Sequence, residues 1–293
     1  MQIQENISLK PYNTFAINVK ARYFSSFSSL DELAELIAIS STNKQQLPTL
    51  TLGGGSNILF TQDYHGLVMK NEFKGIDLIG ETGEHYLVRA AAGENWHQFV
   101  LHCIKNNYAG VENLSLIPGN VGASSMQNIG AYGVEIKDVF HELEAYSIGD
   151  NKVVCFNKED CEFGYRESIF KRKYKDKFII TSVTFKLNKT PEYKVSYGAI
   201  EQEIEKMKVK ELSINAISQA VINIRSSKLP NPEEIGNAGS FFKNPSIPKE
   251  QFEALKAEYD GIVGYPSANE LVKVAAGWLI EQCGWKGYRK GDA

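Results

Sequence analysis

Cysteine is scarce in this chain of 293 residues, and the spacing of the few cysteines present argues against two structural devices. No C-x-x-C pair occurs, so the zinc-site pattern of two paired cysteines followed by two histidines is lacking. We therefore expect no metal site and no disulfide framework, but reduced and mostly buried thiols. His97 and His102 lie in a segment of helical periodicity without a third group beside them, so we assign both a structural role. The cysteines are Cys103, Cys155, Cys161 and Cys283.

An excess of either charge and long apolar runs are also lacking. The chain has 32 Lys and Arg against 35 Asp and Glu, which gives a formal net charge of -3 at pH 7. Without an excess of positive charge, we expect neither nucleic acid nor an anionic lipid surface as a partner. Residues 1–20 lack a basic segment followed by an apolar run, and no stretch of about 18 apolar residues occurs. These absences predict a cytoplasmic protein without membrane insertion.

The patterns that are present indicate a globular α+β fold. Hydrophobic residues make up 43% of the chain, enough for a large core, and the length suggests about two domains. Helical and strand patterns alternate irregularly, which is typical of the α+β class. Ser29 and Glu32 resemble a capping box that begins one helix, and Asn95 begins another that ends near Asn107. Further helical patterns lie at residues 200–207 and 214–224.

The middle of the chain carries the clearest strand signals. Residues 143–148 and 153–156 flank a Gly-Asp-Asn-Lys segment whose composition suits the positive φ values of a tight hairpin. We expect these two strands to pair antiparallel. Residues 179–187 alternate with a period of two, which predicts a strand buried on one face that closes the same sheet.

A first glycine-rich loop follows a short apolar segment at residues 50–52 and reads GGGSN. Three consecutive glycines let backbone N–H groups converge without Cβ atoms in the way, which forms an anion nest suited to a diphosphate. A tight turn between strands is the alternative interpretation, although such a turn needs only one or two glycines. Both interpretations stay open on this motif alone.

A second glycine-rich loop, residues 117–133, reads IPGNVGASSMQNIGAYG and has the small residues needed to wrap closely around a flat ligand. Neither loop has the Lys that follows the last glycine of a Walker loop, and neither has the G-x-G-x-x-G helix opening of a Rossmann domain. A nucleotide would therefore be held in another way.

A third segment, residues 236–245, reads GNAGSFFKNP and places one hydroxyl, that of Ser240, between glycines and a group of aromatic, lysine and amide side chains. A surface turn rich in Gly, Asn and Pro is the alternative interpretation.

Together with FGYRESIFK at residues 163–171, these segments resemble, in the same order, the motifs of the UDP-N-acetylenolpyruvoylglucosamine reductase (UDP-N-acetylmuramate dehydrogenase) family. The resemblance runs from about Asn13 to the end of the chain, and residues 193–199 are similar to the tyrosine-bearing substrate loop of the first subtype. It implies an α+β chain with a two-part FAD-binding fold of the vanillyl-alcohol oxidase (PCMH) type in residues 1–69 and 70–212. A smaller α+β substrate-binding domain would follow in residues 213–293.

The resemblance also implies the activity. In this family NADPH reduces a non-covalently bound FAD, which then passes hydride to the enolpyruvyl double bond of UDP-N-acetyl-3-O-(1-carboxyvinyl)-glucosamine. The product, UDP-N-acetylmuramate, is a peptidoglycan precursor. The implied partners are small molecules, and the implied state is a monomer.

The family's functional positions match particular residues here. Hydride addition builds negative charge at the α-carbon and carboxylate of the substrate, and Arg166 matches the arginine that stabilises it. The α-carbon must then gain a proton, and Ser240 matches the general acid. A surface ion pair is the alternative for Arg166. The positions implied to bind the cofactor are Gly53, Gly54, Gly55, Ser56, Asn57, Pro118, Gly119, Gly122, Ala123, Ser124, Gln127, Asn128, Gly130, Tyr132 and Gly133.

Three further residues match positions that bind the substrate. Tyr197 matches the loop tyrosine that covers the UDP group, Lys228 matches a position that contacts the nucleotide, and Asn244 belongs to the wall beside Ser240. An ordinary aromatic anchor is the alternative for Tyr197. For Lys228 the alternative is a lysine favoured by the dipole at a helix C-terminus.

One catalytic position of the family has no match. Its third catalytic residue is a glutamate near the C-terminus, and Glu270 and Glu281 both stand in the wrong motif context. The pattern resembles a chain whose substrate domain is incomplete beyond Ala293, in which we expect FAD binding to persist and turnover to be weak. Two alternatives remain: a non-covalent FAD sugar or alcohol oxidase of the same fold, and a nucleotide-binding module without turnover. Neither glycine-rich loop contains the His or Cys that tethers FAD in many such oxidases.

Overall fold

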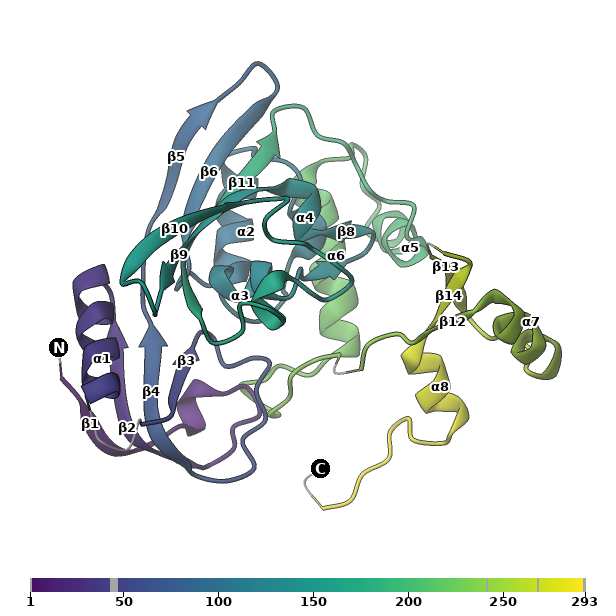
Figure 1. The fold of residues 1–293 in the computed structure, drawn as a ribbon. Helices are drawn as coiled ribbons and strands as arrows, with labels where there is room; N and C mark the ends of the chain where they lie inside the picture. The colour runs from purple at the N-terminus through teal and green to yellow at the C-terminus, as the bar shows by residue number, and fades with distance from the viewer. Residues whose placement is uncertain (1, 43–46, 241, 268, 292–293) are drawn as a thin grey trace. The chain divides into compact units, whose positions relative to one another are not determined.

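The computed structural model describes residues 2–42, 47–240, 242–267 and 269–291, and the chain divides into two compact units (Figure 1). The first unit spans residues 1–238 and the second spans residues 239–293. Each has its own sheet structure and its own buried core. The division at residues 69 and 212 that the sequence resemblance implies stays a prediction.

The first unit begins with a four-stranded sheet of order β1-β2-β4-β3, in which β1 pairs antiparallel with β2 and the other neighbours are parallel. Helix α1 (Leu30–Thr42) covers this sheet with an apolar stripe that includes Leu33 and Leu36. As predicted, Ser29 begins the helix: its Oγ accepts from the Glu32 N–H at 3.2 Å. The strands are β1 (Gln4–Ser8), β2 (Lys20–Phe27), β3 (Thr49–Leu52) and β4 (Tyr64–Asn71), and a 3-10 turn η1 (Lys10–Tyr12) follows β1.

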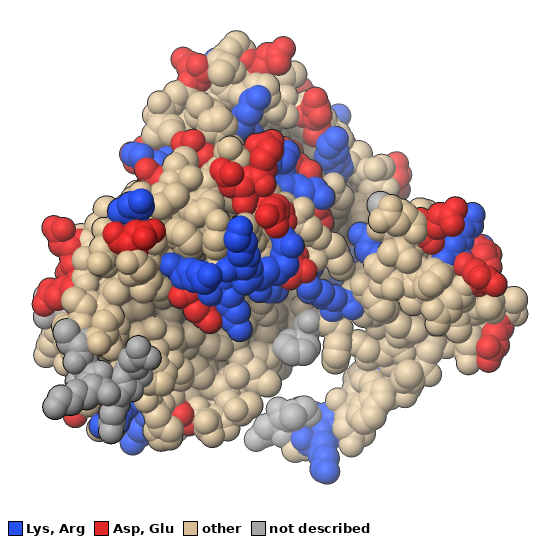
Figure 2. Space-filling model, in the orientation of Figure 1, with Lys and Arg blue, Asp and Glu red and all other residues tan. Residues whose placement is uncertain are grey.

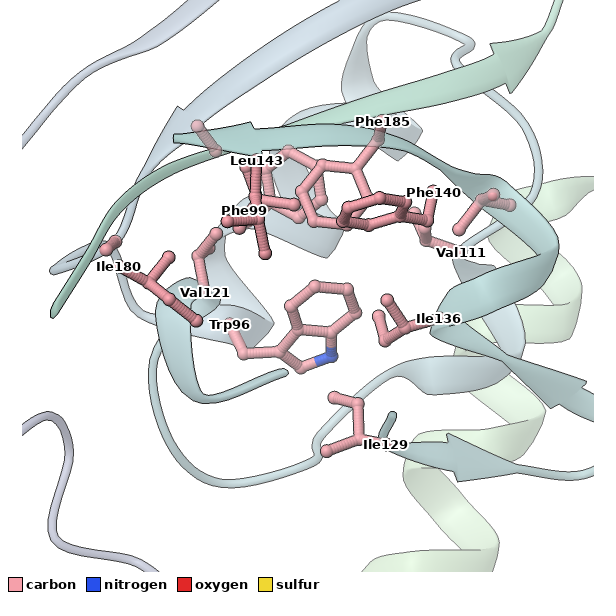
Figure 3. Packing of buried hydrophobic residues seen from close by; sticks show 14 of the residues in the cluster. Trp96, Phe99, Val111, Val121, Ile129, Ile136, Phe140, Leu143, Ile180 and Phe185 are labelled. Atoms are coloured by element: carbon pink, nitrogen blue, oxygen red, sulfur yellow. The ribbon is translucent and has the colours of Figure 1, made fainter. Parts of the chain in front are cut away.

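A five-stranded antiparallel sheet of order β10-β9-β11-β6-β5 carries the main core of the first unit. Helix α2 (Trp96–Lys105) lies against one face, and Figure 3 shows its Trp96 and Phe99 packed near Phe185 of the sheet. The ring centroids of Phe99 and Phe185 are 4.7 Å apart. The strands are β5 (Ile76–Glu81), β6 (His85–Ala91), β9 (Phe140–Ser147), β10 (Lys152–Asn157) and β11 (Phe178–Asn188).

One sequence expectation for this sheet and one for helix α2 are confirmed, and a second expectation for the sheet is wrong. Strands β9 and β10 pair antiparallel around a turn in which Asn151 has φ 50°. Asn95 caps α2, because its side chain accepts from the Gln98 N–H. Strand β11, however, is not a half-buried closing strand: it lies in the middle of the sheet and is buried on both faces. Ile179 packs in the cluster under α1, whereas Val183 packs under α2.

Short elements connect the sheet to a helical pair, as Figure 1 shows in teal and green. Helices α5 (Gly198–Lys206) and α6 (Ile214–Lys228) pack together through Ile200, Val221 and Ile224. Both follow the predicted helical patterns, and α6 ends before Pro230 as expected. The remaining elements of the first unit are η2 (Glu112–Leu114), α3 (Val121–Met126), β7 (Gly130–Ala131), β8 (Val134–Glu135), α4 (Ile136–Val139) and η3 (Ile169–Lys171).

The second unit is a small α+β layer with a three-stranded antiparallel sheet of order β12-β14-β13. Its core is a cluster of four buried side chains, Phe252, Ile262, Val272 and Val274. The elements are β12 (Ser246–Pro248), α7 (Lys249–Glu258), β13 (Gly264–Pro266), β14 (Leu271–Val274) and α8 (Ala276–Gln282).

The cysteines are free thiols, and their burial differs from the sequence expectation. Cys103 and Cys161 are buried, and burial raises the pKa of Cys161 to about 12. Cys155 and Cys283 are exposed, because Cys155 lies on β10 at the edge of the sheet and Cys283 follows α8. The expectation of mostly buried thiols is therefore wrong for two of the four. No helix of the described part of the chain is long and apolar enough to span a membrane.

Candidate cofactor and substrate site

The first two glycine-rich loops approach each other closely where Gly54 meets Gly119. A Cβ atom on Gly54 would come within 2.9 Å of the Gly119 Cα atom. Gly55 has φ 62°, and a Cβ atom there would overlap the carbonyl oxygen of Tyr12. The glycines are needed for this contact between two backbones.

Side-chain hydrogen bonds join the same two loops. Ser56 Oγ donates to the Pro118 carbonyl at 3.2 Å, and Asn57 Nδ2 donates to Gln127 Oε1 at 2.7 Å. Between the loops lies a cavity of about 230 Å³. The predicted cofactor residues that line it are Gly53, Gly54, Gly55, Ser56, Asn57, Pro118, Ala123, Ser124 and Gln127.

Sequence reasoning missed part of this cavity. Trp96 and Lys171 line it although neither stands in a glycine-rich loop, and Asn120 was passed over within the second loop. The FGYRESIFK motif was the one signal that could have drawn attention to Lys171. The other lining residues that were not predicted are Thr51, Leu52, Ile58, Met126 and Ile129.

Six predicted cofactor residues do not line the cavity, and several of them serve the packing around it. A Cβ atom on Gly122 would come within 2.8 Å of the Ala92 Cβ atom, so this glycine lets α3 approach the end of β6. The Tyr132 carbonyl accepts from Asn113, whereas Gly133 has φ 81° and open space around it. The six are Gly119, Gly122, Asn128, Gly130, Tyr132 and Gly133.

Two buried hydroxyls beside these loops lack hydrogen-bond partners in the described part of the chain: Thr14 Oγ1 and Ser125 Oγ. The Thr14 N–H donates to the Gly55 carbonyl, and Ser125 stands between two residues that line the cavity. Buried polar atoms are usually paired, so unpaired ones beside a nest of glycine N–H groups fit a site for a polar ligand. The residues present therefore fit a bound nucleotide cofactor.

Arg166 stands at the tip of a hairpin closed by two hydrogen bonds between Gly164 and Glu167, at 3.0 and 3.3 Å. Its φ of 54° lies in the left-handed region. The guanidinium donates to the backbone carbonyls of Asn128, at 3.4 Å, and Gly130. No described carboxylate forms a salt bridge with it, so the surface ion pair considered from the sequence is wrong.

A second arginine, Arg225 on α6, was missed in the sequence. Its Nε donates to the Leu116 carbonyl at 3.2 Å, and it too has no salt bridge to a carboxylate in the described ranges. Burial lowers the pKa of Arg225, the charge of Tyr132 raises it, and the positive charge of Arg166 lowers it further. Arg225 precedes Lys228 by three residues on the same helix, and this spacing was the available signal.

His97 supports the backbone of this region. Its Nδ1 accepts from the Leu116 N–H at 3.0 Å, so His97 and Arg225 bind the two peptide groups on either side of the Leu116 Cα atom. Burial lowers the pKa of His97, and the charge of Arg225 lowers it further. A neutral imidazole is the form that accepts this hydrogen bond.

The predicted tyrosine loop lies beside the second glycine-rich loop. The rings of Tyr197 and Tyr132 meet edge to face with centroids 5.8 Å apart. Asn113, which is 1% exposed, donates to the Tyr132 carbonyl at 3.0 Å and to the Lys194 carbonyl at 2.8 Å, and so ties the two loops together. Lys228 is exposed in the last turn of α6, where a lysine also suits the helix dipole.

Ser240 and Asn244 belong to the second unit, whereas Arg166, Tyr197 and Lys228 belong to the first. Ser240 is exposed, and its neighbour Phe241 lies outside the described residues. Asn244 Oδ1 accepts from the Ala276 N–H at 3.0 Å and so satisfies the first turn of α8. Among the described residues no group of three His, Cys, Asp or Glu side chains could hold a metal ion.

Comparison with known proteins places these features in one family. Residues 22–156 match a family model described as an FAD binding domain. Residues 231–293 match the model of the UDP-N-acetylenolpyruvoylglucosamine reductase C-terminal domain. A reductase of that name from Amoebophilus asiaticus is 52% identical over 99% of this chain and 85% of its own length. One from Pseudomonas putida is 48% identical over 100% of this chain and 86% of its own.

The chain belongs to the UDP-N-acetylenolpyruvoylglucosamine reductase family. A solved reductase from Thermus caldophilus shares the fold, with a TM-score of 0.66 and 23% identity over 100% of this chain and 84% of that one. The predicted family, the α+β class and the FAD-binding fold of the PCMH type are thus confirmed. The chain is an FAD-dependent oxidoreductase of peptidoglycan precursor synthesis.

Proposed function

We propose that this enzyme reduces UDP-N-acetyl-3-O-(1-carboxyvinyl)-glucosamine to UDP-N-acetylmuramate, with NADPH as the hydride donor. The observation that carries the proposal is the identity of about half of all residues, over nearly the whole chain, with reductases named for this substrate. The enzyme would work as a cytoplasmic monomer on small molecules alone. The two glycine-rich loops would hold FAD without a covalent tether, and the flavin would supply the hydride transfer from NADPH to the β-carbon of the enol ether.

The glycine-rich loops bind and orient the cofactor in this scheme. Residues 53–57 line the cavity, and an anionic diphosphate is the group that a nest of glycine N–H groups favours. Trp96 forms part of the cavity wall and is fixed by its Nε1–H, which donates to the Leu114 carbonyl at 2.8 Å. A rigid wall keeps the cofactor in one orientation.

Arg166 binds the substrate carboxylate and stabilises the charge that develops beside it. Two backbone carbonyls fix the guanidinium, and its other N–H groups stay available for an anion. Arg225 supports the same role, because a half-buried cation without a carboxylate partner among the described residues favours an incoming negative charge. This preorganisation stabilises the transition state more than the neutral vinyl group of the substrate.

Ser240 donates the proton that the α-carbon needs. A hydroxyl is a weak acid, so this step requires a short distance and exclusion of water. Tyr197 would cover the UDP group and so exclude water, and the positive charge of Lys228 would bind a phosphate. Asn244 would hold the substrate beside Ser240.

The test separates the two half-reactions of the flavin-loaded enzyme. With Ser240→Ala, NADPH should still bleach the flavin under anaerobic conditions, whereas reoxidation by the UDP-sugar should slow by about 10²–10⁴-fold. Ser246→Ala, an exposed serine on β12 in the same unit, is the matched control and should reoxidise at the normal rate. Normal reoxidation of Ser240→Ala would remove this serine from the mechanism. A protein that binds FAD but is not bleached by NADPH would overturn the proposed reaction.

A further inference from the structure

The side chain of Asn128 is committed to holding the protein together. It is 0% exposed, and its Nδ2 donates to the Gly164 carbonyl at 2.9 Å and to Glu135 Oε2 at 3.2 Å. Its Oδ1 accepts from the Lys137 N–H at 3.0 Å. An asparagine amide has two N–H donors, and both are used here. A cofactor would find no free donor on this side chain.

The partners of Asn128 are the parts of the structure that place Arg166. Gly164 begins the hairpin that carries Arg166 at its tip, and the Nδ2 bond fastens that hairpin to the second glycine-rich loop. The main chain of Asn128, at φ 44°, turns its own carbonyl toward Arg166 Nη1. Asparagine tolerates this left-handed conformation better than most residues.

The other side of the guanidinium depends on the same segment. Arg166 Nη2 donates to the Gly130 carbonyl, and a Cβ atom on Gly130 would come within 3.0 Å of Arg166 Nη1. Residues 128–130 therefore supply both acceptors and the space for the guanidinium. A second fastener, the 2.6 Å hydrogen bond from Ser168 Oγ to the Met126 carbonyl, holds the far end of the hairpin. Loss of Asn128 would thus shift the hairpin without releasing it.

We infer that Asn128 is a positioning residue for Arg166, in place of the cofactor-binding role that the sequence resemblance implies. The inference rests on the proposed role of Arg166 at the substrate carboxylate. Asn128 acts through the hairpin and through its own carbonyl and touches neither flavin nor substrate. Its removal should therefore leave cofactor binding intact and weaken the step that needs a fixed cation.

The experiment measures three quantities in the flavin-loaded enzyme: flavin content, the rate of bleaching by NADPH, and the rate of reoxidation by the UDP-sugar. In Asn128→Ala the first two should stay within twofold of the parent, and reoxidation should slow by up to about 100-fold, the cost of a small misplacement. Asn107→Ala is the matched control, because Asn107 also has a left-handed φ, of 58°, but is exposed at the end of α2. It should leave all three quantities unchanged.

A double-mutant cycle distinguishes positioning from a general structural effect. If Asn128 acts only through Arg166, Asn128→Ala combined with Arg166→Ala should be no slower than Arg166→Ala alone. Additive losses, or loss of flavin from Asn128→Ala, would overturn the inference while leaving the proposed function intact. Normal reoxidation of Arg166→Ala alone would instead remove the arginine from the proposed function.

A second variant covers the case in which Asn128→Ala does not fold. Asn128→Asp keeps the size of the side chain and the acceptor for the Lys137 N–H, but it loses both donors. It should reproduce the selective loss of reoxidation with flavin content unchanged. Reoxidation at the parent rate in this variant would contradict the inference.

Discussion

The paired loops at residues 53–57 and 117–133 and the segment at residues 236–245 are all rich in glycine, yet the structure uses them differently. In the first region, glycines let two backbones meet where any side chain would collide. In the second, a Cβ atom on Gly236 would overlap the Phe15 carbonyl oxygen, whereas Ser240, Phe242 and Lys243 are exposed. Phe242, for example, is 65% exposed.

A glycine-rich segment therefore has one of two structural roles in this protein. Between the paired loops it serves close approach of the backbones, which the hydrogen bonds of Ser56 and Asn57 hold together. Around Ser240 it serves access, because short side chains leave the hydroxyl open.

Figure 2 shows that Lys and Arg gather near the middle of the face of the first unit in view, although the chain as a whole is slightly acidic.

The largest effect is expected where a Cβ atom is forced against the backbone that packs on the first glycine-rich loop. Gly55→Ala places a side chain in the left-handed region, which costs roughly 1–2 kcal/mol, and drives it into the Tyr12 carbonyl. We expect a lower free energy of unfolding by at least that amount and loss of most bound flavin. Flavin absorbance of the purified protein and denaturant unfolding measure both.

The control for Gly55→Ala is Gly149→Ala in the hairpin turn between β9 and β10. Gly149 has nothing within 4 Å of a built Cβ atom, so its free energy of unfolding should change by less than about 1 kcal/mol. If both substitutions lowered the free energy of unfolding equally, close packing at Gly55 would not explain the loss. The difference that we draw between closely packed and open glycines would then be wrong.

Much of this arrangement could be read from the sequence because the signals are local. Asn95 predicted the start of α2 through capping, and the Gly-Asp-Asn-Lys turn predicted the β9–β10 hairpin. The three consecutive glycines predicted a backbone nest, and the structure puts them at a cavity. Each of these depends on residues within a few positions of one another.

What the sequence could not give depends on long-range packing. The period-two pattern of β11 is the same for an edge or a central strand, and only its neighbours β9 and β6 show that both faces are buried. Arg225 is an ordinary helix residue until the fold brings it to Tyr132 and Arg166. The sequence shows that Asn128 matches a family motif, but it does not show that both of its amide N–H groups donate to Gly164 and Glu135.

An intermediate effect is expected in the second region. Asn244→Ala removes the side chain that accepts from the Ala276 N–H, so the second unit should lose about 1 kcal/mol, the typical worth of one hydrogen bond. Hydrogen exchange of the α8 amides should speed up, while flavin content stays at the parent level because the cavity lies wholly in the first unit. Release of flavin from this variant would show that the two regions are not independent.

The smallest effect concerns the peptide just before the second glycine-rich loop, and it is a pH dependence. Burial holds the pKa of His97 below its ordinary value of about 6.5, so between that value and the folded pKa the unfolded chain binds more protons. Stability from this group is therefore complete above about pH 6.5 and falls as the pH drops through that window. Protonation also removes the acceptor for the Leu116 N–H.

His97→Gln should flatten this dependence, since a glutamine oxygen can still accept from Leu116 but does not titrate. His141→Gln, at an exposed position on β9, should keep the parent slope. The measurement is the free energy of unfolding of the parent and both variants, with flavin bound, at several pH values between 5 and 8. If His97→Gln keeps the slope, the titration of His97 does not cause the pH dependence of stability in this range, and the pKa shift of this histidine has no measurable effect on folding.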